Sequence, residues 1–272
     1  MLTTGQLFAG TDPFTVTEAG ITQYESEYDQ ASDQISYAEL TTLDYHPAEG
    51  QYTVYNVEGG YFVFFETTTP SGHPPILFRI PFYVPKRTYA RWKEQDRPQR
   101  PEPPAERTQY VPESIEEGVG SFVGEMLDLM AELQGYTSDK ERIEYISTFV
   151  QSLPYALDPI STGFRDYSRY PAEILVDAQG DCVDTSILLC VALLESAVDC
   201  EVAYFSFSPA AVEASDGGHL AVGIAPENVS YEDARTIESR GKSYYYIEPT
   251  GFTPVAEIPS RFDFDHAQIH HV

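Results

Sequence analysis

The hydrophobic pattern changes its period near residue 113, and this change constrains the fold more than any other feature of the sequence. Before this point, apolar residues alternate with polar ones in short runs. After Glu113 they recur at helical spacing, at Ile115, Val119, Phe122, Val123, Met126, Met130 and Leu133. Residues three or four apart share one face of a helix. The run therefore predicts one amphipathic helix of about six turns that ends near Gly135.

Residues 1–85 are predicted to form a β-rich N-terminal region. The runs 51–57 and 61–65 alternate apolar and polar side chains, and a Glu-Gly-Gly turn separates them. This arrangement is typical of a β-hairpin. Two further strands are predicted at 34–43 and 75–84.

Residues 86–112 are predicted to connect this region to the rest of the chain. The stretch contains seven of the 16 basic residues, Lys86, Arg87, Arg91, Lys93, Arg97, Arg100 and Arg107. It also contains Pro98, Pro101, Pro103 and Pro104, which favour an extended, polyproline-like backbone. Two interpretations follow: a stiff linker that lies on the acidic surface of its own chain, or a strap that docks an acidic partner.

Residues 113–272 are predicted to form a second domain. A capping box, Ser138 to Glu141, begins a second helix, which Pro154 ends. Residues 153–179 show no clear period, and a third helix is predicted at 182–197. Strands are predicted after it at 201–207, 219–224 and 243–248. Helices followed by consecutive strands indicate an α+β fold and not the alternation of a doubly wound sheet.

The charge balance excludes two classes of partner. Acidic residues number 43 and basic residues 16, which gives a net charge of −27. Such a charge repels nucleic-acid backbones and anionic lipid surfaces. Only four of the basic residues are lysine, and an acidic, lysine-poor composition is typical of halophilic proteins, because molar salt screens the repulsion.

Other features indicate a cytoplasmic protein. The sequence contains no window of about 18 apolar residues, the length that a membrane-spanning helix needs. The sequence around Met1 has neither the basic segment nor the apolar segment of a signal peptide. The three cysteines, Cys182, Cys190 and Cys200, are odd in number and lack CxxC spacing, so neither a disulfide framework nor a structural zinc site is expected.

The segment Gly180-Asp181-Cys182 carries the strongest chemical signal. Gly180 permits a sharp turn, and Asp181 is a competent N-cap for the apolar helix that follows. Cys182 would then lie in the first helical turn, where unpaired N–H groups and the helix dipole favour a thiolate and lower the thiol pKa. The same N–H groups could bind an oxyanion.

A thiol nucleophile needs an imidazole and a group that orients the imidazole. His219 begins a predicted strand, and Glu248 ends the next one. If the two strands are antiparallel neighbours, the imidazole and the carboxylate lie side by side.

These segments resemble the transglutaminase-like superfamily of papain-like cysteine enzymes, in its archaeal and bacterial branch. The matching segments are Tyr170-Pro-Ala-Glu-Ile-Leu175, Gly180-Asp-Cys-Val-Asp184, His219-Leu-Ala-Val222 and Tyr246-Ile-Glu-Pro-Thr250. The resemblance covers roughly residues 138–255. It implies a papain-like core, in which the nucleophile helix packs on an antiparallel sheet.

The resemblance also implies roles for three residues. Cys182 would be the nucleophile, His219 the general base and Glu248 the orienting acid. Glu248 departs from the family pattern, because the third residue there is usually aspartate. The oxyanion would be bound by the backbone N–H of Cys182, with Tyr155 or Gln151 as a side-chain donor. No cofactor or metal is expected.

Other residues with possible chemical roles are weaker candidates. Asp184 lies in the first helical turn, where it could cap the helix or act in catalysis. Cys190 would lie about 12 Å along the helix from Cys182, too far for a disulfide. Cys190 and Cys200 are expected in the core. The histidines near the C-terminus, His266, His270 and His271, are expected in a frayed tail and not in a metal site.

The sequence thus predicts thiol-dependent acyl transfer on the amides of a protein or peptide substrate. The acyl group would pass to water, as in a cysteine peptidase or amidase, or to an amine, as in cross-linking. Two other hypotheses stay open. The domain could be a catalytically inactive interaction module, or the N-terminal β-rich region could bind peptides and deliver them.

Overall fold

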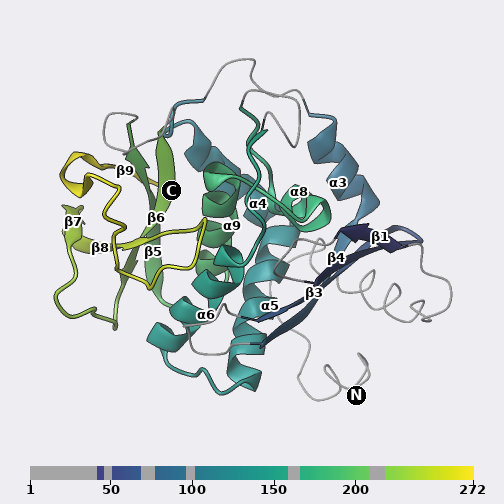
Figure 1. Ribbon diagram of the computed structural model, residues 1–272, viewed down its shortest axis with the longest axis horizontal. Helices are drawn as coiled ribbons and strands as arrows, with labels where there is room; N and C mark the ends of the chain where they lie inside the picture. The colour runs from purple at the N-terminus through teal and green to yellow at the C-terminus, as the bar shows by residue number, and fades with distance from the viewer. Residues whose placement is uncertain (1–41, 46–50, 69–76, 96–101, 159–165, 209–217) are drawn as a thin grey trace.

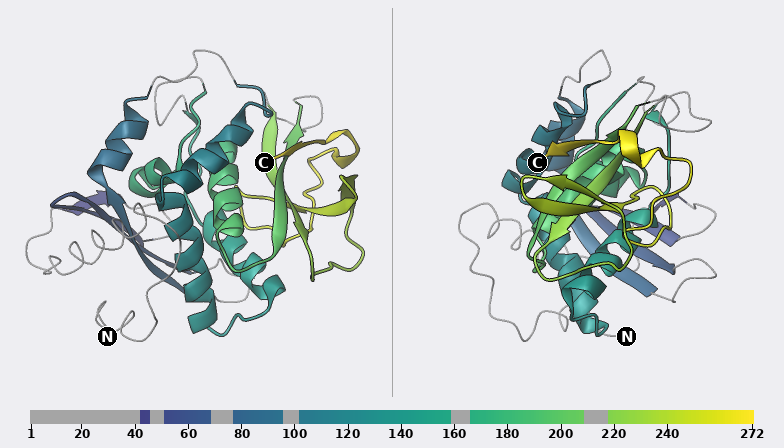
Figure 2. Two further views of the ribbon diagram at one scale, coloured as in Figure 1. Left: turned by 180° about the vertical axis from the view of Figure 1, so that it is seen from behind. Right: turned by 90° about the vertical axis from the view of Figure 1, so that its left-hand side faces the viewer.

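In the described part of the chain, two antiparallel sheets lie on either side of a layer of helices. A computed structural model describes residues 42–45, 51–68, 77–95, 102–158, 166–208 and 218–272. The helices separate the N-terminal sheet from the C-terminal one (Figure 1), and the view from behind shows the same order of layers (Figure 2). The predicted α+β class is confirmed at this level.

The N-terminal sheet is an antiparallel meander in the order β1-β2-β3-β4. The predicted hairpin is confirmed, with Val57 paired to Gly60 across its turn. The strand predicted at 75–84 is also confirmed, whereas most of the one predicted at 34–43 lies outside the described residues. The strands are β1 Thr42–Tyr45, β2 Gln51–Val57, β3 Gly60–Thr68 and β4 Leu77–Pro85.

The helical layer follows. Its main helices are α3 Lys86–Lys93, α4 Tyr110–Glu116, α5 Val119–Leu133, α6 Asp139–Gln151, α8 Pro171–Asp177 and α9 Cys182–Leu194. The capping box at the start of α6 is confirmed, because Ser138 accepts a hydrogen bond from the Glu141 N–H and Glu141 bonds back to Ser138. The third predicted helix is α9, which ends three residues earlier than predicted.

The prediction of one long helix after residue 113 is wrong. The chain forms α4 and α5 as separate helices, which Gly118 divides. Gly118 has a φ of 92°, in the left-handed region that glycine enters without steric cost. Hydrophobic spacing alone does not reveal such a break, because apolar residues on both sides of Gly118 face the same core.

The prediction of an extended connector over 86–112 is wrong at both ends, because residues 107–109 form a helical turn and 110–112 already belong to α4. Residues 86–93 form α3, which buries Thr88 and Trp92. The prolines that favour an extended backbone all come after residue 97, so they do not oppose this helix. Residues 96–101 lie outside the described part of the chain.

The prediction of an irregular stretch over 153–179 also needs correction, because α8 lies within it. Pro171 occupies the first turn, where its missing N–H costs nothing. Glu173 accepts a hydrogen bond from the Tyr170 N–H at 3.0 Å. Seven residues are too few to show a helical period in the sequence.

The C-terminal sheet has the order β7-β8-β6-β5-β9, with antiparallel neighbours throughout. Three of its strands were predicted, and the other two, β7 and β9, were not. The expectation of a frayed tail is therefore wrong, because β9 pairs with β5 close to the chain end. The strands are β5 Cys200–Phe207, β6 His219–Pro226, β7 Thr236–Ser239, β8 Lys242–Ile247 and β9 Gln268–His271.

Both faces of this sheet are covered. Val202, Tyr204 and Val222 belong to a core that continues through the helices into the N-terminal sheet. On the opposite face, a smaller cluster joins Phe205 and Phe207 to Phe262 of the C-terminal segment. The alternation of side chains along each strand supplies both faces. One hydrophobic core thus includes residues of all three predicted segments of the chain.

Helix α9 lies in the middle of this core, and α5 approaches it closely at two glycines. Every residue of α9 from Val183 to Leu193 is buried. A Cβ atom on Gly120 would lie 2.6 Å from a methyl group of Val191, and one on Gly124 would lie 2.6 Å from the Glu195 Cβ. The two helices can therefore pack at this distance only if these positions lack a side chain.

None of the helices in the described part of the chain has the length and apolar character that crossing a lipid bilayer requires.

The close contact between α5 and α9 predicts a cost for Gly124→Ala. The added methyl group would also meet the Ala192 carbonyl oxygen at 2.9 Å. Overpacking costs about 1–3 kcal/mol, against a gain of about 1 kcal/mol from helix propensity. We expect the free energy of unfolding, measured with urea, to fall by about 1 kcal/mol. Gly251→Ala, where a Cβ meets open space, is the control, and an equal effect of both substitutions would contradict the packing argument.

Candidate active site

The cap at the start of α9 fixes the position of Cys182. The Asp181 carboxylate accepts hydrogen bonds from the Val183 N–H at 2.8 Å and the Asp184 N–H at 3.2 Å. The Asp184 side chain accepts in return from the Asp181 N–H at 3.1 Å. The predicted N-cap is therefore confirmed. The cap uses the N–H groups of Val183 and Asp184. The N–H of Cys182, in the same helical turn, does not bond to the cap.

A buried arginine, Arg169, forms ion pairs with the carboxylates around this cap. Arg169 is fully buried, and its guanidinium pairs with Asp158 at 3.2 Å, with Asp177 at 3.5 Å and with Asp184. Burial and the neighbouring carboxylates raise the pKa values of Asp158, Asp181 and Asp184, whereas Arg169 lowers those of Asp158 and Asp184. Asp184 is thus part of the support of the helix start, as the capping interpretation predicted.

Cys182 faces the start of β6. Ser186, one turn further along α9, donates a hydrogen bond from its hydroxyl to the Leu220 carbonyl oxygen at 3.2 Å. The Leu220 N–H in turn donates to the Cys182 sulfur. Residues four apart share a helix face, so this face of α9 lies on the strand residue that follows His219.

His219 and Glu248 lie side by side, as the sequence predicted. Strands β6 and β8 are antiparallel neighbours, with Val222 paired to Ile247. The His219 Nε2 atom lies 3.1 Å from the Glu248 Oε2 atom. Only 1% of the Glu248 side chain is exposed and 10% of the His219 side chain, so water competes little for this contact.

Glu248 stays ionised although it is buried. Burial alone raises its pKa, but hydrogen bonds from His219, Thr250 and Tyr246 lower the pKa to about 2. The Tyr246 hydroxyl donates at 2.6 Å, and Thr250 donates from its N–H at 3.1 Å and from its hydroxyl at 2.5 Å. Both carboxylate oxygens of Glu248 therefore accept hydrogen bonds.

The loop before β9 adds two residues that the sequence did not single out. The Phe262 ring stacks on the His219 imidazole, with centroids 4.5 Å apart and planes 13° apart. The Arg261 guanidinium lies 3.7 Å from Glu248 Oε2 and over the Phe262 ring. Phe262 thus limits rotation of the imidazole. No sequence signal marked it, because it lies 43 residues beyond His219, outside any strand.

The prediction of a lowered pKa for Cys182 is wrong. Burial of the thiol raises its pKa, and the nearby Asp181 carboxylate adds to the rise. The Leu220 N–H and the charge of Arg107 oppose the rise but are weaker. Burial, with the capping carboxylate as a second cause, therefore holds the isolated thiol in its neutral form.

Of the two predicted oxyanion donors, only Tyr155 has a hydrogen left to donate. Gln151 is buried, and its amide nitrogen donates to the carbonyl oxygens of Glu248 at 2.8 Å and Thr253 at 2.9 Å. Both amide hydrogens are thus used, and Gln151 positions Glu248 instead of binding an oxyanion. Burial and the charges of Cys182 and Asp181 raise the pKa of Tyr155, so its hydroxyl keeps its proton and can donate.

Cys190, Cys200, His270 and His271 have other neighbours than the three predicted catalytic residues. Cys190 is buried and Cys200 half-buried, and the three cysteines are unpaired. His270 contacts the Ser206 hydroxyl at 2.8 Å, and His271 contacts that of Ser239 at 2.8 Å. Within the described residues, no three His, Cys, Asp or Glu side chains gather in a way that could hold a metal ion.

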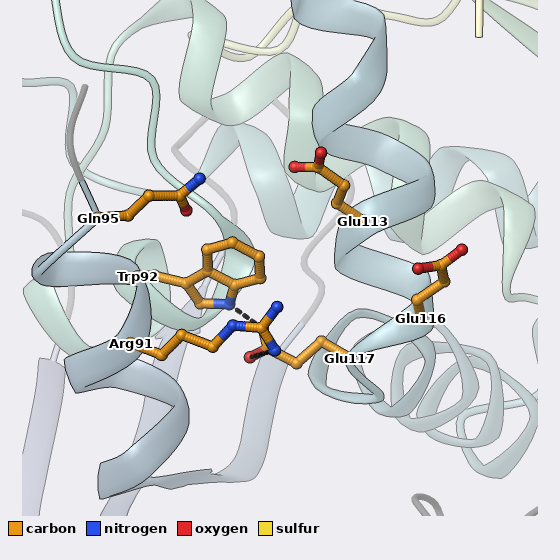
Figure 3. A pocket seen from close by; sticks show the side chains of 6 residues that line it. All are labelled: Arg91, Trp92, Gln95, Glu113, Glu116 and Glu117. Atoms are coloured by element: carbon orange, nitrogen blue, oxygen red, sulfur yellow. Dashed lines mark hydrogen bonds and ion pairs between the residues drawn. The ribbon is translucent and has the colours of Figure 1, made fainter. Parts of the chain in front are cut away.

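A hollow of about 350 Å³ lies between α3 and α4, and none of the predicted site residues lines it. Figure 3 shows Trp92 in its middle, with Glu113 and Glu116 on the facing helix. Two of its carboxylates are engaged, Glu117 by Trp92 and Glu113 by the Tyr170 hydroxyl. Burial of Glu117 raises its pKa to about 8.

No protein-family model matches this sequence, and neither does any curated protein. The site is therefore interpreted from its own geometry.

Ionisation of Glu248 predicts how stability depends on pH. The pKa falls from its usual 4.5 to about 2, so the ionised form stabilises the fold above pH 4.5, and this contribution is lost as the pH falls toward 2. For Glu248→Gln we expect the free energy of unfolding to drop by roughly 3 kcal/mol at pH 7, and the difference from wild type to vanish near pH 2.

Urea unfolding at several pH values between 2 and 7 measures this difference. Glu232→Gln, at an exposed position, is the matched control and should leave the free energy of unfolding within about 0.5 kcal/mol of wild type. A Glu248→Gln difference that does not change with pH would contradict the assignment of an ionised, hydrogen-bonded carboxylate.

Proposed function

We propose that the protein catalyses thiol-dependent acyl transfer on peptide-type amides, with Cys182, His219 and Glu248 as its catalytic residues. The observation that carries this proposal is the 3.1 Å contact between His219 and Glu248 on strands β6 and β8, next to the cysteine at the start of α9. The packing of α9 on an antiparallel sheet supports the resemblance to the transglutaminase-like core.

The first half of the reaction forms a thioester. Because Nε2 of His219 contacts Glu248, Nδ1 is the nitrogen that takes the proton from the Cys182 thiol as the sulfur attacks the amide carbonyl carbon. The Cys182 N–H and the Tyr155 hydroxyl can stabilise the oxyanion. The C–N bond then breaks, and the leaving amine takes the proton from His219.

The second half releases the acyl group. His219 removes a proton from water or from an amine, which attacks the thioester carbon, and the C–S bond breaks. The proton returns to the Cys182 sulfur. Water requires no second binding site, which favours hydrolysis over cross-linking. The raised pKa of the thiol suits this route, because the proton leaves only when the nucleophile attacks.

The same raised pKa favours a second candidate function. A thiol held neutral by burial and by Asp181 is also what a transglutaminase-like domain would keep if it had lost catalysis and become a protein-interaction module. The two candidates differ in whether Cys182 reacts with help from His219.

Labelling of the cysteines by iodoacetamide, followed residue by residue by mass spectrometry in molar salt, separates these functions. If His219 acts as a base, His219→Ala should slow the alkylation of Cys182 at pH 7 by about 100-fold. Cys200 is the internal control, because it is half-buried and its rate should not depend on His219. Equal Cys182 rates in the two proteins would remove the enzyme proposal and leave the interaction module.

A further inference from the structure

Lys93, at the end of α3, is one of the basic residues of the predicted connector. Its ammonium group lies 2.6 Å from the Asp177 Oδ2 atom and 3.8 Å from the Glu173 carboxylate, both in α8. The ammonium group also lies over the rings of Tyr89 and Tyr167. Lys93 thus joins the end of α3 to the last turn of α8.

Asp177 is shared between Lys93 and the buried Arg169. The Lys93 Nζ atom lies 2.6 Å from Asp177 Oδ2, and the Arg169 Nε atom lies 3.5 Å from the same oxygen. The Tyr89 hydroxyl donates to the other oxygen, Oδ1, at 2.7 Å. The attraction between charges grows as their distance falls. The charge of Asp177 is therefore compensated mainly by Lys93, and Arg169 is its more distant cation.

Arg169 is also bound to the start of α9. Its guanidinium pairs with Asp184, and its backbone N–H donates to the Asp184 Oδ1 atom at 2.7 Å. Asp184 accepts in turn from the Asp181 N–H at 3.1 Å. These contacts form a continuous chain from Arg169 to the residue that precedes Cys182.

Asp177 and Asp184 compete for the same guanidinium. Arg169 is fully buried, and Asp158 is its third carboxylate partner, at 3.2 Å. Little water screens these charges, so the guanidinium is attracted strongly by each of them. Without the charge of Lys93, Asp177 would lose its nearest cation and would attract Arg169 more strongly. Asp184 would then lose part of its compensation, and the cap of α9 would loosen.

We propose that Lys93 is a positioning residue for Cys182. It compensates the charge of Asp177, so that Arg169 stays paired with Asp184 at the start of the nucleophile helix. This inference rests on the proposed function, because it concerns how the nucleophile of that reaction is kept in place. It assigns the end of α3 a role in the site, although no residue of α3 is among the predicted catalytic residues.

Amide hydrogen exchange of Asp181, measured by NMR on the full chain, tests this proposal. Lys93→Met keeps an unbranched side chain against the rings of Tyr89 and Tyr167 but removes the charge. We expect the Asp181 N–H to exchange at least about tenfold faster in this variant, because its acceptor is held less firmly. In Asp177→Asn the competing charge is absent, so exchange should stay within about twofold of wild type. The double variant Lys93→Met/Asp177→Asn should regain the protection of wild type.

A role of Lys93 in attaching α3 to α8, and nothing more, predicts a different pattern. Lys93→Met and Asp177→Asn break the same ion pair, so their effects would be equal and the double variant would restore nothing. That pattern, or unchanged exchange in Lys93→Met, would overturn the proposal. Lys140→Met, which removes a lysine 4.0 Å from Glu144 on α6, is the matched control and should leave exchange of Asp181 unchanged.

Alkylation by iodoacetamide connects the cap to the reaction. The quantity measured is the ratio of the Cys182 rates with and without His219, because a change in exposure of the thiol affects both rates. We expect this ratio to fall from about 100 to about 10 or less in Lys93→Met and to recover in the double variant. An unchanged ratio in Lys93→Met would overturn the positioning role. Equal rates with and without His219 in otherwise wild-type protein would overturn the acyl-transfer proposal instead, and the exchange pattern would still decide whether Lys93 supports the cap.

Discussion

The ion pair between Arg169 and Asp184 supports the start of α9, and the candidate site depends on it. Both side chains are fully buried, so neither charge can be solvated by water. Removal of one partner of such a pair leaves an uncompensated buried charge, which is strongly destabilising. Because Asp184 also bonds the Asp181 N–H, the pair fixes the turn from which Cys182 is presented. The position of Cys182 and the stability of the helix start are thus coupled.

Two carboxylates near the thiol experience opposite environments. Glu248 receives hydrogen bonds from three side chains and one backbone N–H, and its pKa is lowered to about 2. Asp181 receives two backbone bonds, but burial and the charge of Asp158 outweigh them and raise its pKa. The site therefore keeps a permanent negative charge next to the imidazole and a weaker one next to the sulfur.

The sequence predicted the elements that have a local signal. The Gly-Asp-Cys turn, the Asp181 cap and the strands that begin at His219 and end before Glu248 follow from residue type and alternation over a few positions. Gln151 shows the limit of this approach. Its side chain was expected at the oxyanion, but it bonds to carbonyl groups about a hundred residues later in the chain, and nothing local to position 151 indicates this.

Other features depended on tertiary packing and could not be predicted. The break at Gly118 follows from the fit of two helices against one core, and the contact of Phe262 with His219 follows from the path of the loop before β9. The strand β9 is only four residues long, and it is stabilised by its pairing with β5. The pKa of Cys182 depended on burial of the sulfur, which residue order does not reveal.

Acylation of Cys182 tests the central claim most directly. The protein is mixed with p-nitrophenyl acetate and quenched in acid, and the acetylated residue is located by mass spectrometry. The account predicts an acetyl thioester on Cys182 in wild type, none at that position in Cys182→Ala, and formation about 100-fold slower in His219→Ala. Acetylation of Cys182 at the same rate with and without His219, or no faster than that of Cys200, would contradict it.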